Sequence, residues 1–179
     1  MRDVIGQVLM RWRIRAVLPH VDGFLLDIGC GTNRLVRSYK GKGIGVDVYQ
    51  WGEADLIVED TAHLPYKNGT FDTVTIVAAL NHIPNRREVL KEANRLLKVN
   101  GRIIITMLPP RISRLWHLVR RPWDADQKER TMQAGEVYGM DRFDVSTLLQ
   151  AAGFEVVVEK SFMCGVNRLS IGKKKPVRQ

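Results

Sequence analysis

Residues 27–31, with the sequence DIGCG, place a carboxylate two residues before the first of two glycines. They directly follow the apolar residues 24–26, so they lie at the end of a buried strand if that run is extended. In an open parallel sheet, ligands bind beyond the carboxyl ends of the strands. Gly29 and Gly31 can adopt backbone angles closed to other residues and let a ligand approach the main chain. The segment therefore predicts a cradle for a nucleotide-like cofactor.

Two classes of cofactor compete for such a cradle. Dinucleotides use the pattern G-x-G-x-x-G, in which a helix N-terminus faces a pyrophosphate. Here Arg34 stands where the third glycine belongs. The carboxylate of Asp27 would repel a pyrophosphate, but it would attract an ammonium or a sulfonium group. S-adenosyl-L-methionine (SAM) carries both of these groups, so the acid favours SAM over a dinucleotide.

Two further acids follow predicted strands. Asp47, in the sequence GVDV, can accept hydrogen bonds from two ribose hydroxyls, which both cofactor classes possess. Asp60, in the sequence EDTAHLP, can accept from the exocyclic amine of adenine. A second interpretation of Asp60 stays open, because Thr61 and the turn-rich residues 67–69 favour local hydrogen bonds in which Asp60 only shapes a turn.

Apolar strands alternate with helices along the chain, which is typical of a parallel sheet covered on both faces. We expect strands at residues 24–28, 43–48, 55–60, 71–80 and 101–108, and helices at 4–18, 35–39 and 85–98. Asn85 is the expected N-cap of the last helix. Helical spacing predicts that the first helix, stopped by Pro19, buries one apolar stripe formed by Val4, Ile5, Val8, Leu9 and Trp12.

The C-terminal part ends in a helix stopped by Gly153 and two strands at residues 154–162 and 166–174. Only residues 163–165 separate these strands, and so short a connection can join antiparallel strands but not parallel ones. The sheet is therefore expected to end in an antiparallel hairpin.

Composition fits one domain over residues 1–179, long enough to bury a core. No apolar run approaches the roughly 20 residues of a bilayer span, and arginines interrupt the N-terminus, so we expect no signal peptide. The two cysteines are expected to be reduced thiols in a cytoplasmic protein.

The net charge of +9 favours an anionic partner, either RNA or a membrane surface to which the protein binds peripherally. The N-terminal helix (1–19) and a basic tail (173–179) would make the contact. The alternative is that both segments are merely solvated.

Four segments in order resemble the class I SAM-dependent methyltransferases, especially their small-molecule, type 11-like branch: DIGCGTN, GVDV, EDTAHLPYKNGTFDTVTIVAALNHIPN and VLKEANRLLKVNGRIIITML. The resemblance runs from about residue 24 to residue 108. It implies an α/β fold, a Rossmann-like three-layer sandwich. Its seven-stranded, mostly parallel sheet would have the order 3-2-1-4-5-7-6 with strand 7 antiparallel, which agrees with the predicted hairpin.

The resemblance also implies site residues. Asp27, Gly29 and Gly31 would line the methionine end of SAM. Cys30 belongs to the same loop as a small packing residue and not as a nucleophile. Asp47 would hold the ribose, and Val48 would lie against adenine. Asp60 and Thr61 would contact the edge of the adenine ring, and Val77 and Ala78 would border the sulfonium. No metal ligands are expected.

His82 follows the fourth expected strand in the sequence LNHIP. It could take a proton from an acceptor hydroxyl or amine, or it could only shape the cofactor pocket. Residues 109–142 would form a lid on the substrate side. An acceptor site there could be lined by Trp116, His117, Trp123, Asp124 and Tyr138, although these side chains could equally form the packed core of the lid.

The sequence thus predicts a methyltransferase that moves the SAM methyl group to a small-molecule or lipid-linked acceptor. The mechanism would be in-line displacement, in which positioning supplies much of the rate. Two alternatives stay open at this point. One is methylation of tRNA or rRNA, which the positive charge favours, and the other is a non-catalytic SAM-binding module.

Overall fold

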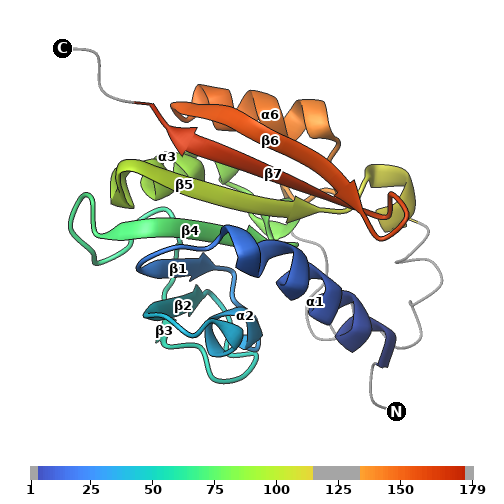
Figure 1. Cartoon of the computed structure of the whole chain (residues 1–179), viewed down its shortest axis with the longest axis horizontal. Helices are drawn as coiled ribbons and strands as arrows, with labels where there is room; N and C mark the ends of the chain where they lie inside the picture. Colours follow the sequence, from blue (N-terminus) through green and yellow to red (C-terminus); the bar gives the residue numbers. More distant parts are fainter. Residues whose placement is uncertain (1–3, 115–133, 176–179) are drawn as a thin grey trace.

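The computed structural model describes residues 4–114 and 134–175. Its seven-stranded sheet has the order β3-β2-β1-β4-β5-β7-β6 (Figure 1). The strands are β1 (Leu25–Ile28), β2 (Gly43–Asp47), β3 (Leu56–Ile57), β4 (Phe71–Val77), β5 (Leu97–Met107), β6 (Phe154–Phe162) and β7 (Asn167–Lys174). β1 pairs in parallel with β2 and β4, and β4 with β5, whereas β7 is antiparallel to both β5 and β6. The predicted fold class and the C-terminal hairpin are confirmed.

Helices cover both faces of the sheet. In Figure 1, α1 (Val4–Val17) and α2 (Arg34–Ser38) lie on the near face, and α3 (Arg86–Leu96) and α6 (Arg142–Ala151) lie behind. Alternate residues of β5 pack on opposite faces of the sheet. Ile103 and Ile105 belong to the hydrophobic cluster that includes side chains of α3 and α6, and Ile104 belongs to the cluster that includes side chains of α1 and α2. This alternation follows from the period of two in a strand, and it gives the three-layer sandwich.

The expected apolar stripe of α1 is exposed at two of its residues. Val8 and Trp12 are 43% and 50% exposed, whereas Arg13 and Ile14 are buried. Arg13 can face inward because its Nε donates to Oδ1 of Asn167 at 3.0 Å, which compensates part of the cost of burying the guanidinium. Apolar periodicity cannot identify a buried face that carries an arginine.

Two local predictions also change. β5 begins at Leu97 rather than residue 101, with Asn100 in the left-handed region at φ 64°. Asn85 precedes α3, but its side chain makes no capping bond and donates to Asp60 instead. The strand β7 ends at Lys174, as predicted, and it therefore includes the first two residues assigned to the basic tail.

Candidate active site

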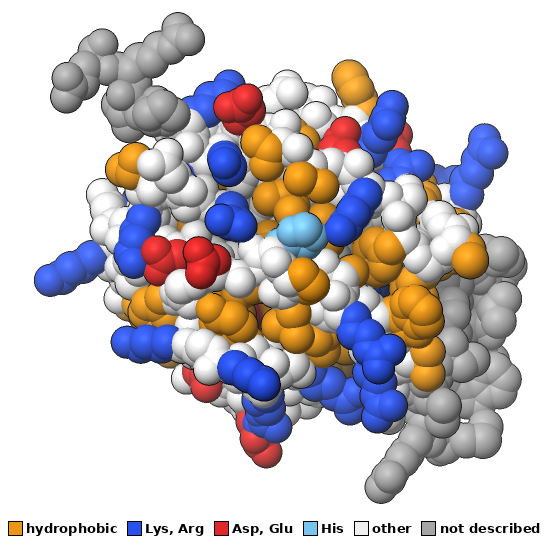
Figure 2. Space-filling view, viewed as in Figure 1, with side chains coloured by type: hydrophobic (Ala, Val, Ile, Leu, Met, Phe, Trp, Pro, Cys, Tyr) orange, Lys and Arg blue, Asp and Glu red, His pale blue; other side chains and the backbone are white. Residues whose placement is uncertain are grey.

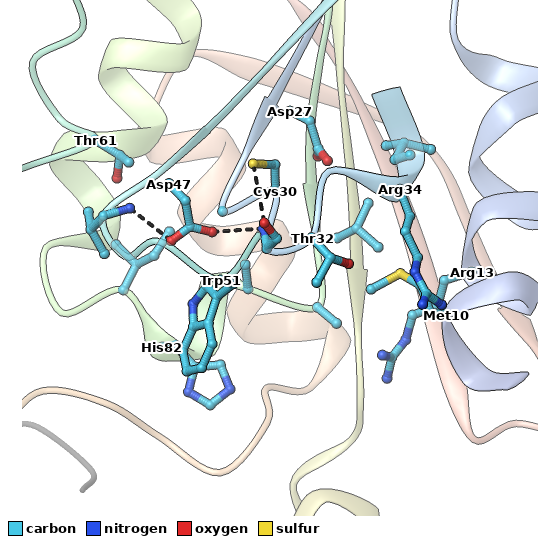
Figure 3. Close-up of a pocket in the computed structure, with 18 of the residues that line it drawn as sticks. Met10, Arg13, Asp27, Cys30, Thr32, Arg34, Asp47, Trp51, Thr61 and His82 are labelled. Atoms are coloured by element: carbon cyan, nitrogen blue, oxygen red, sulfur yellow. Dashed lines mark hydrogen bonds between the residues drawn. The ribbon is translucent and has the colours of Figure 1, made fainter. Parts of the chain in front are cut away.

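A cavity of about 460 Å³ lies at the carboxyl ends of β1, β2 and β4 (Figure 3). Its lining residues include three groups. The strand-end wall comprises Asp27, Gly29, Cys30, Gly31 and Asp47, the η2 wall comprises Ala79, His82, Ile83 and Glu136, and the α1 wall comprises Gly6, Met10 and Arg13. The η2 wall takes its name from the 3₁₀ helix Leu80–His82 that follows β4.

Asp47 connects the loops that follow β1 and β2. Its Oδ2 accepts from the backbone N–H of Gly31 at 2.8 Å, and its Oδ1 accepts from those of Val48 and Tyr49 at 2.8 and 3.1 Å (Figure 3). The side chain is buried, with the residue only 6% exposed. A carboxylate has about four acceptor positions, so three amides still leave room for a ribose hydroxyl. Asp47 therefore holds the cradle together in addition to facing the cavity.

The two glycines of the cradle have different surroundings. Gly29 has φ +71°, and a Cβ there would lie 2.6 Å from the Cβ of Ala79 in the η2 wall. Gly31 has φ +54°, and among the described residues no heavy atom lies within 4 Å of its Cβ position. Gly29 thus permits close packing between two loops, while Gly31 leaves open space beside the main chain for a ligand.

Asp27 is a buried acid at the base of the cavity. It is 2% exposed and accepts a hydrogen bond from Oγ1 of Thr75 at 2.6 Å. Burial raises the pKa of Asp27 to about 7, and the negative charge of Asp47 adds to the increase. Such a carboxyl gains most from a bound cation, which would restore its ionised form. The site therefore fits the ammonium or sulfonium group of SAM.

Cys30 shares the strand-end wall but carries no nucleophilic chemistry. Burial, together with the neighbouring carboxylates, raises the pKa of its thiol to about 12. A thiol in that state is almost entirely protonated at neutral pH and reacts slowly. Both Cys30, which is buried, and Cys164, which is exposed, are free.

Most of the other predicted cofactor residues meet at the same cavity, since Val48, Thr61, Val77 and Ala78 all line it. Asp60 does not. Its Oδ1 accepts from the N–H of Ala62 at 2.8 Å and from Nδ2 of Asn85 at 3.0 Å, and the bond from Asn85 is the main cause that lowers its pKa. These contacts favour the turn-forming interpretation of Asp60, and its contact with adenine stays a prediction.

Sequence reasoning missed several lining residues. Trp51 lines the cavity, and in the view of Figure 3 its indole projects between Asp47 and His82. Its ring lies 4.4 Å from that of Tyr49. Position was the only available signal, because Trp51 lies in the loop after β2, four residues beyond the acid that is predicted to hold the ribose. Arg13 and Arg34 line the opposite side in that view, and no sequence pattern indicated them.

The acceptor side is described only in part. His82 lines the cavity, and its Nδ1 lies 3.4 Å from Oε2 of Glu136. Tyr138 is 37% exposed and is not among the lining residues. The other residues predicted to line an acceptor site lie outside the described residues: Trp116, His117, Trp123 and Asp124.

Within residues 4–114 and 134–175, no three His, Cys, Asp or Glu side chains come together in a group that could hold a metal ion. In the same part of the chain, none of the helices has the length and apolar character that a membrane span requires.

The geometry can be compared with known proteins. Residues 26–105 match the model of a family described as "Methyltransferase domain". Over these residues the chain is similar to class I SAM-dependent methyltransferase domains. The methyl donor of this family is SAM. The matched residues include β1, β2 and β4 and therefore the whole strand-end wall.

Curated relatives of this chain include enzymes named demethylmenaquinone methyltransferase. The one from Thermotoga maritima is 29% identical over 135 residues, which cover 63% of this chain and 59% of the relative. The one from Clavibacter sepedonicus is 27% identical, over 91% of this chain and 79% of the relative. This chain thus spans less than two thirds of the Thermotoga relative's length.

Solved structures show the same fold. A SAM-dependent methyltransferase from Thermotoga maritima superposes with a TM-score of 0.67 and 20% identity, over 95% of this chain and 96% of that one. A methyltransferase in complex with the Trm112 activator from Haloferax volcanii has a TM-score of 0.72 at 15% identity, over 97% and 93% of the two chains. At these identities the likeness concerns the fold alone.

Proposed function

We propose that this domain transfers the methyl group of SAM to a small-molecule or lipid-linked acceptor. The observation that carries the proposal is the buried carboxyl of Asp27, whose pKa is raised to about 7 beside a glycine loop and an open cavity. A cationic ligand satisfies that carboxyl, and a pyrophosphate does not. SAM supplies a methyl group already activated by its positive sulfur.

The chain's own residues would bind and orient the two substrates. Asp27 would face the positive end of SAM, and Asp47 would accept from its ribose while it keeps the amides of Gly31 and Val48 in place. Trp51 would cover the nucleoside and exclude water. Much of the rate would come from holding the acceptor in line with the methyl group.

For the acceptor we propose a demethylmenaquinone-type ring, since several relatives bear that name. A quinone ring is an electrophile, so it would have to be presented in its reduced, dihydroxy form to attack a methyl group. The N-terminal helix supports a lipid-linked acceptor, because Val8 and Trp12 are exposed on α1 beside the exposed Arg11 and Arg15. A face of this composition suits an anionic membrane surface.

Methylation of RNA has less support. On the face of the molecule seen in Figure 2, Lys and Arg side chains are spread among hydrophobic and acidic ones. Proteins that retain nucleic acid through phosphate contacts concentrate such charges in a patch or a stripe. The other alternative, a module that binds SAM but has no activity, also has less support. The strand-end wall is complete, and His82 and Glu136 lie together in the cavity, where they could take part in catalysis.

The first experiment is calorimetric titration of the purified chain with SAM, S-adenosylhomocysteine and NAD. We expect binding of the first two and not of NAD. Asp47→Asn should weaken SAM binding about tenfold or more, because one lost acceptor atom leaves a ribose hydroxyl or a backbone amide unsatisfied. Asp55→Asn is the matched control. Its Oδ2 accepts from the N–H of Gly45 at 2.7 Å, but it lies outside the cavity, so it should lose stability without losing affinity.

The second experiment adds reduced demethylmenaquinone with a short isoprenoid tail and follows methyl transfer by mass spectrometry. Product formation supports the proposed acceptor. SAM binding with no product would reject this acceptor but keep the cofactor assignment, and binding of NAD alone would overturn both.

A further inference from the structure

His82 and Glu136 meet in the cavity although they lie 54 positions apart in the chain. The distance from His82 Nδ1 to Glu136 Oε2 is 3.4 Å, and both residues line the cavity. The side chain of Glu136 is only 3% exposed, whereas that of His82 is 33% exposed. Burying a carboxylate is costly unless a partner compensates it, so a glutamate in this place needs an explanation.

The chain on either side of Glu136 is fastened to the η2 segment. The N–H of Val137 donates to the carbonyl of Asn81 at 3.0 Å, and Nδ2 of Asn81 donates back to the carbonyl of Val137 at 3.3 Å. Nη2 of Arg86 donates to the carbonyls of Gly135 and Asn81 at 2.6 and 3.2 Å. Val137 is thus bound directly to Asn81, the residue that precedes His82, and Gly135 is linked to Asn81 through Arg86. These bonds hold Glu136 opposite the imidazole of His82.

We propose that His82 is the general base for the acceptor and that Glu136 is the residue that positions it. The inference rests on the proposed function, and it narrows the substrate class to acceptors whose O–H or N–H must be deprotonated. An ionised carboxylate only accepts hydrogen bonds. Nδ1 of His82 therefore carries the proton that faces Glu136, and Nε2 is the atom that receives the proton of the acceptor.

The proposed step balances in atoms and charge. The acceptor's O–H or N–H bond breaks, its proton goes to Nε2 of His82, and its electron pair makes the acceptor nucleophilic at oxygen, nitrogen or a conjugated ring carbon. The nucleophile forms a bond to the methyl carbon as the carbon–sulfur bond breaks, and that electron pair stays on sulfur. S-adenosylhomocysteine leaves without the sulfonium charge, and the imidazolium of His82 lies beside the Glu136 carboxylate, which stabilises it. Solvent then removes the proton.

Other charged groups face the pair from neighbouring elements. Arg86 on α3 interacts electrostatically with Glu136, but its guanidinium is hydrogen-bonded to three carbonyl groups, those of Leu80, Asn81 and Gly135. Asp47 on β2 lines the same cavity, with its carboxylate engaged by backbone amides. Glu136 is therefore the carboxylate that the structure pairs with His82.

The first test compares turnover of reduced demethylmenaquinone in His82→Gln, Glu136→Gln and the double variant. General-base catalysis contributes about 10²–10⁴-fold, so we expect His82→Gln to lower kcat about 100-fold and Glu136→Gln about tenfold, with SAM affinity unchanged within about twofold. Because the two residues act as a unit, the double variant should be no slower than His82→Gln alone. His63→Gln is the control, because His63 also pairs with a carboxylate, Asp60 at 3.5 Å, but lies outside the cavity.

The second test needs no acceptor. In ¹⁵N-labelled protein, ¹H–¹⁵N correlation spectra report which ring nitrogen of His82 carries the proton. We expect this proton on Nδ1 in the wild type, where it faces Glu136, and a loss of that preference in Glu136→Leu. A wild-type ring protonated on Nε2 would contradict the positioning role of Glu136.

The two tests separate the possible failures. A wild-type His82 protonated on Nε2, or turnover retained within twofold in both single variants, would overturn the pair while leaving the proposed function intact. A wild-type chain that neither binds SAM nor forms product would remove the proposed function, and the spectra would still decide whether Glu136 positions the ring of His82.

Discussion

The strand-end wall and the η2 wall differ in how far apart their parts lie along the chain. Asp27, Gly29 and Gly31 are close neighbours, and Asp47 joins them across one strand pair through the amide of Gly31. In the η2 wall, His82 meets Glu136 only because hydrogen bonds between distant segments hold them together. The first wall is built into the sheet, whereas the second depends on the docking of residues 134–140 against η2.

This difference predicts two kinds of sensitivity. Substitutions of the acids and glycines of the strand-end wall should change SAM affinity and folding stability together, because these residues shape both the backbone of the cradle and the cavity beside it. Substitutions in the η2 wall should change turnover and leave SAM affinity almost unchanged. The three predictions below test the first half of this contrast, and the variants of His82 and Glu136 test the second.

The largest expected effect is that of Gly29→Ala. Alanine would have to keep φ at +71° and to place its Cβ 2.6 Å from that of Ala79. The left-handed conformation costs about 1–2 kcal/mol and the overlap about 1–3 kcal/mol. We expect the free energy of unfolding, measured in urea, to fall by the sum of these two costs. SAM affinity should fall at least 100-fold.

Gly31→Ala is its matched control. An alanine at this position would also have to adopt a left-handed conformation, at φ +54°, but no described heavy atom lies within 4 Å of its Cβ position. Its loss of stability should be about 1–2 kcal/mol. Equal losses in the two variants would mean that the contact between Gly29 and Ala79 is not part of a rigid wall.

An intermediate effect is expected for Asp27→Asn. The folded-state pKa of about 7 lies above the ordinary value of 3.8. Between these two pH values the folded chain keeps a proton that the unfolded chain has lost, so stability falls as the pH rises through this window. Asparagine removes this dependence, and the variant should be ~2–4 kcal/mol more stable than the wild type at pH 8, measured by urea unfolding.

The same substitution should weaken SAM binding about tenfold at pH 8, because the cation loses its carboxylate. Wild-type affinity, measured by calorimetry, should rise between pH 6 and pH 8 as Asp27 ionises, and the affinity of the variant should stay flat. A variant that is less stable than the wild type at pH 8 would show that the buried charge is already compensated without a ligand.

The smallest effect is expected for Cys30→Ala. Because the pKa of the Cys30 thiol is raised to about 12 and the residue is buried, we expect turnover and SAM affinity within about twofold of the wild type. In the folded wild-type chain at pH 8, iodoacetamide should label the exposed Cys164 and spare Cys30, as read by peptide mass spectrometry. Rapid labelling of Cys30 would contradict a closed strand-end wall.

Much of the fold could be predicted from the sequence, because its signals are local. The apolar runs, the glycines after β1 and the three-residue connection before β7 each fix an element or a direction through nearby residues. The predictions that changed depended on distant partners. Asn85 gives up its capping role because Asp60 approaches it from another loop, and α1 turns Arg13 inward because Asn167 of β7 accepts from it.

The sequence by itself determined the cofactor side of this protein. An acid, two glycines and a second strand-end acid must converge at one edge of a parallel sheet, because parallel strands carry their carboxyl ends to the same edge. Tertiary structure alone decided the protonation of Asp27, the inward turn of Arg13 and the partner of His82. Each of these depends on burial and on contacts between residues far apart in the chain, and no local pattern encodes them.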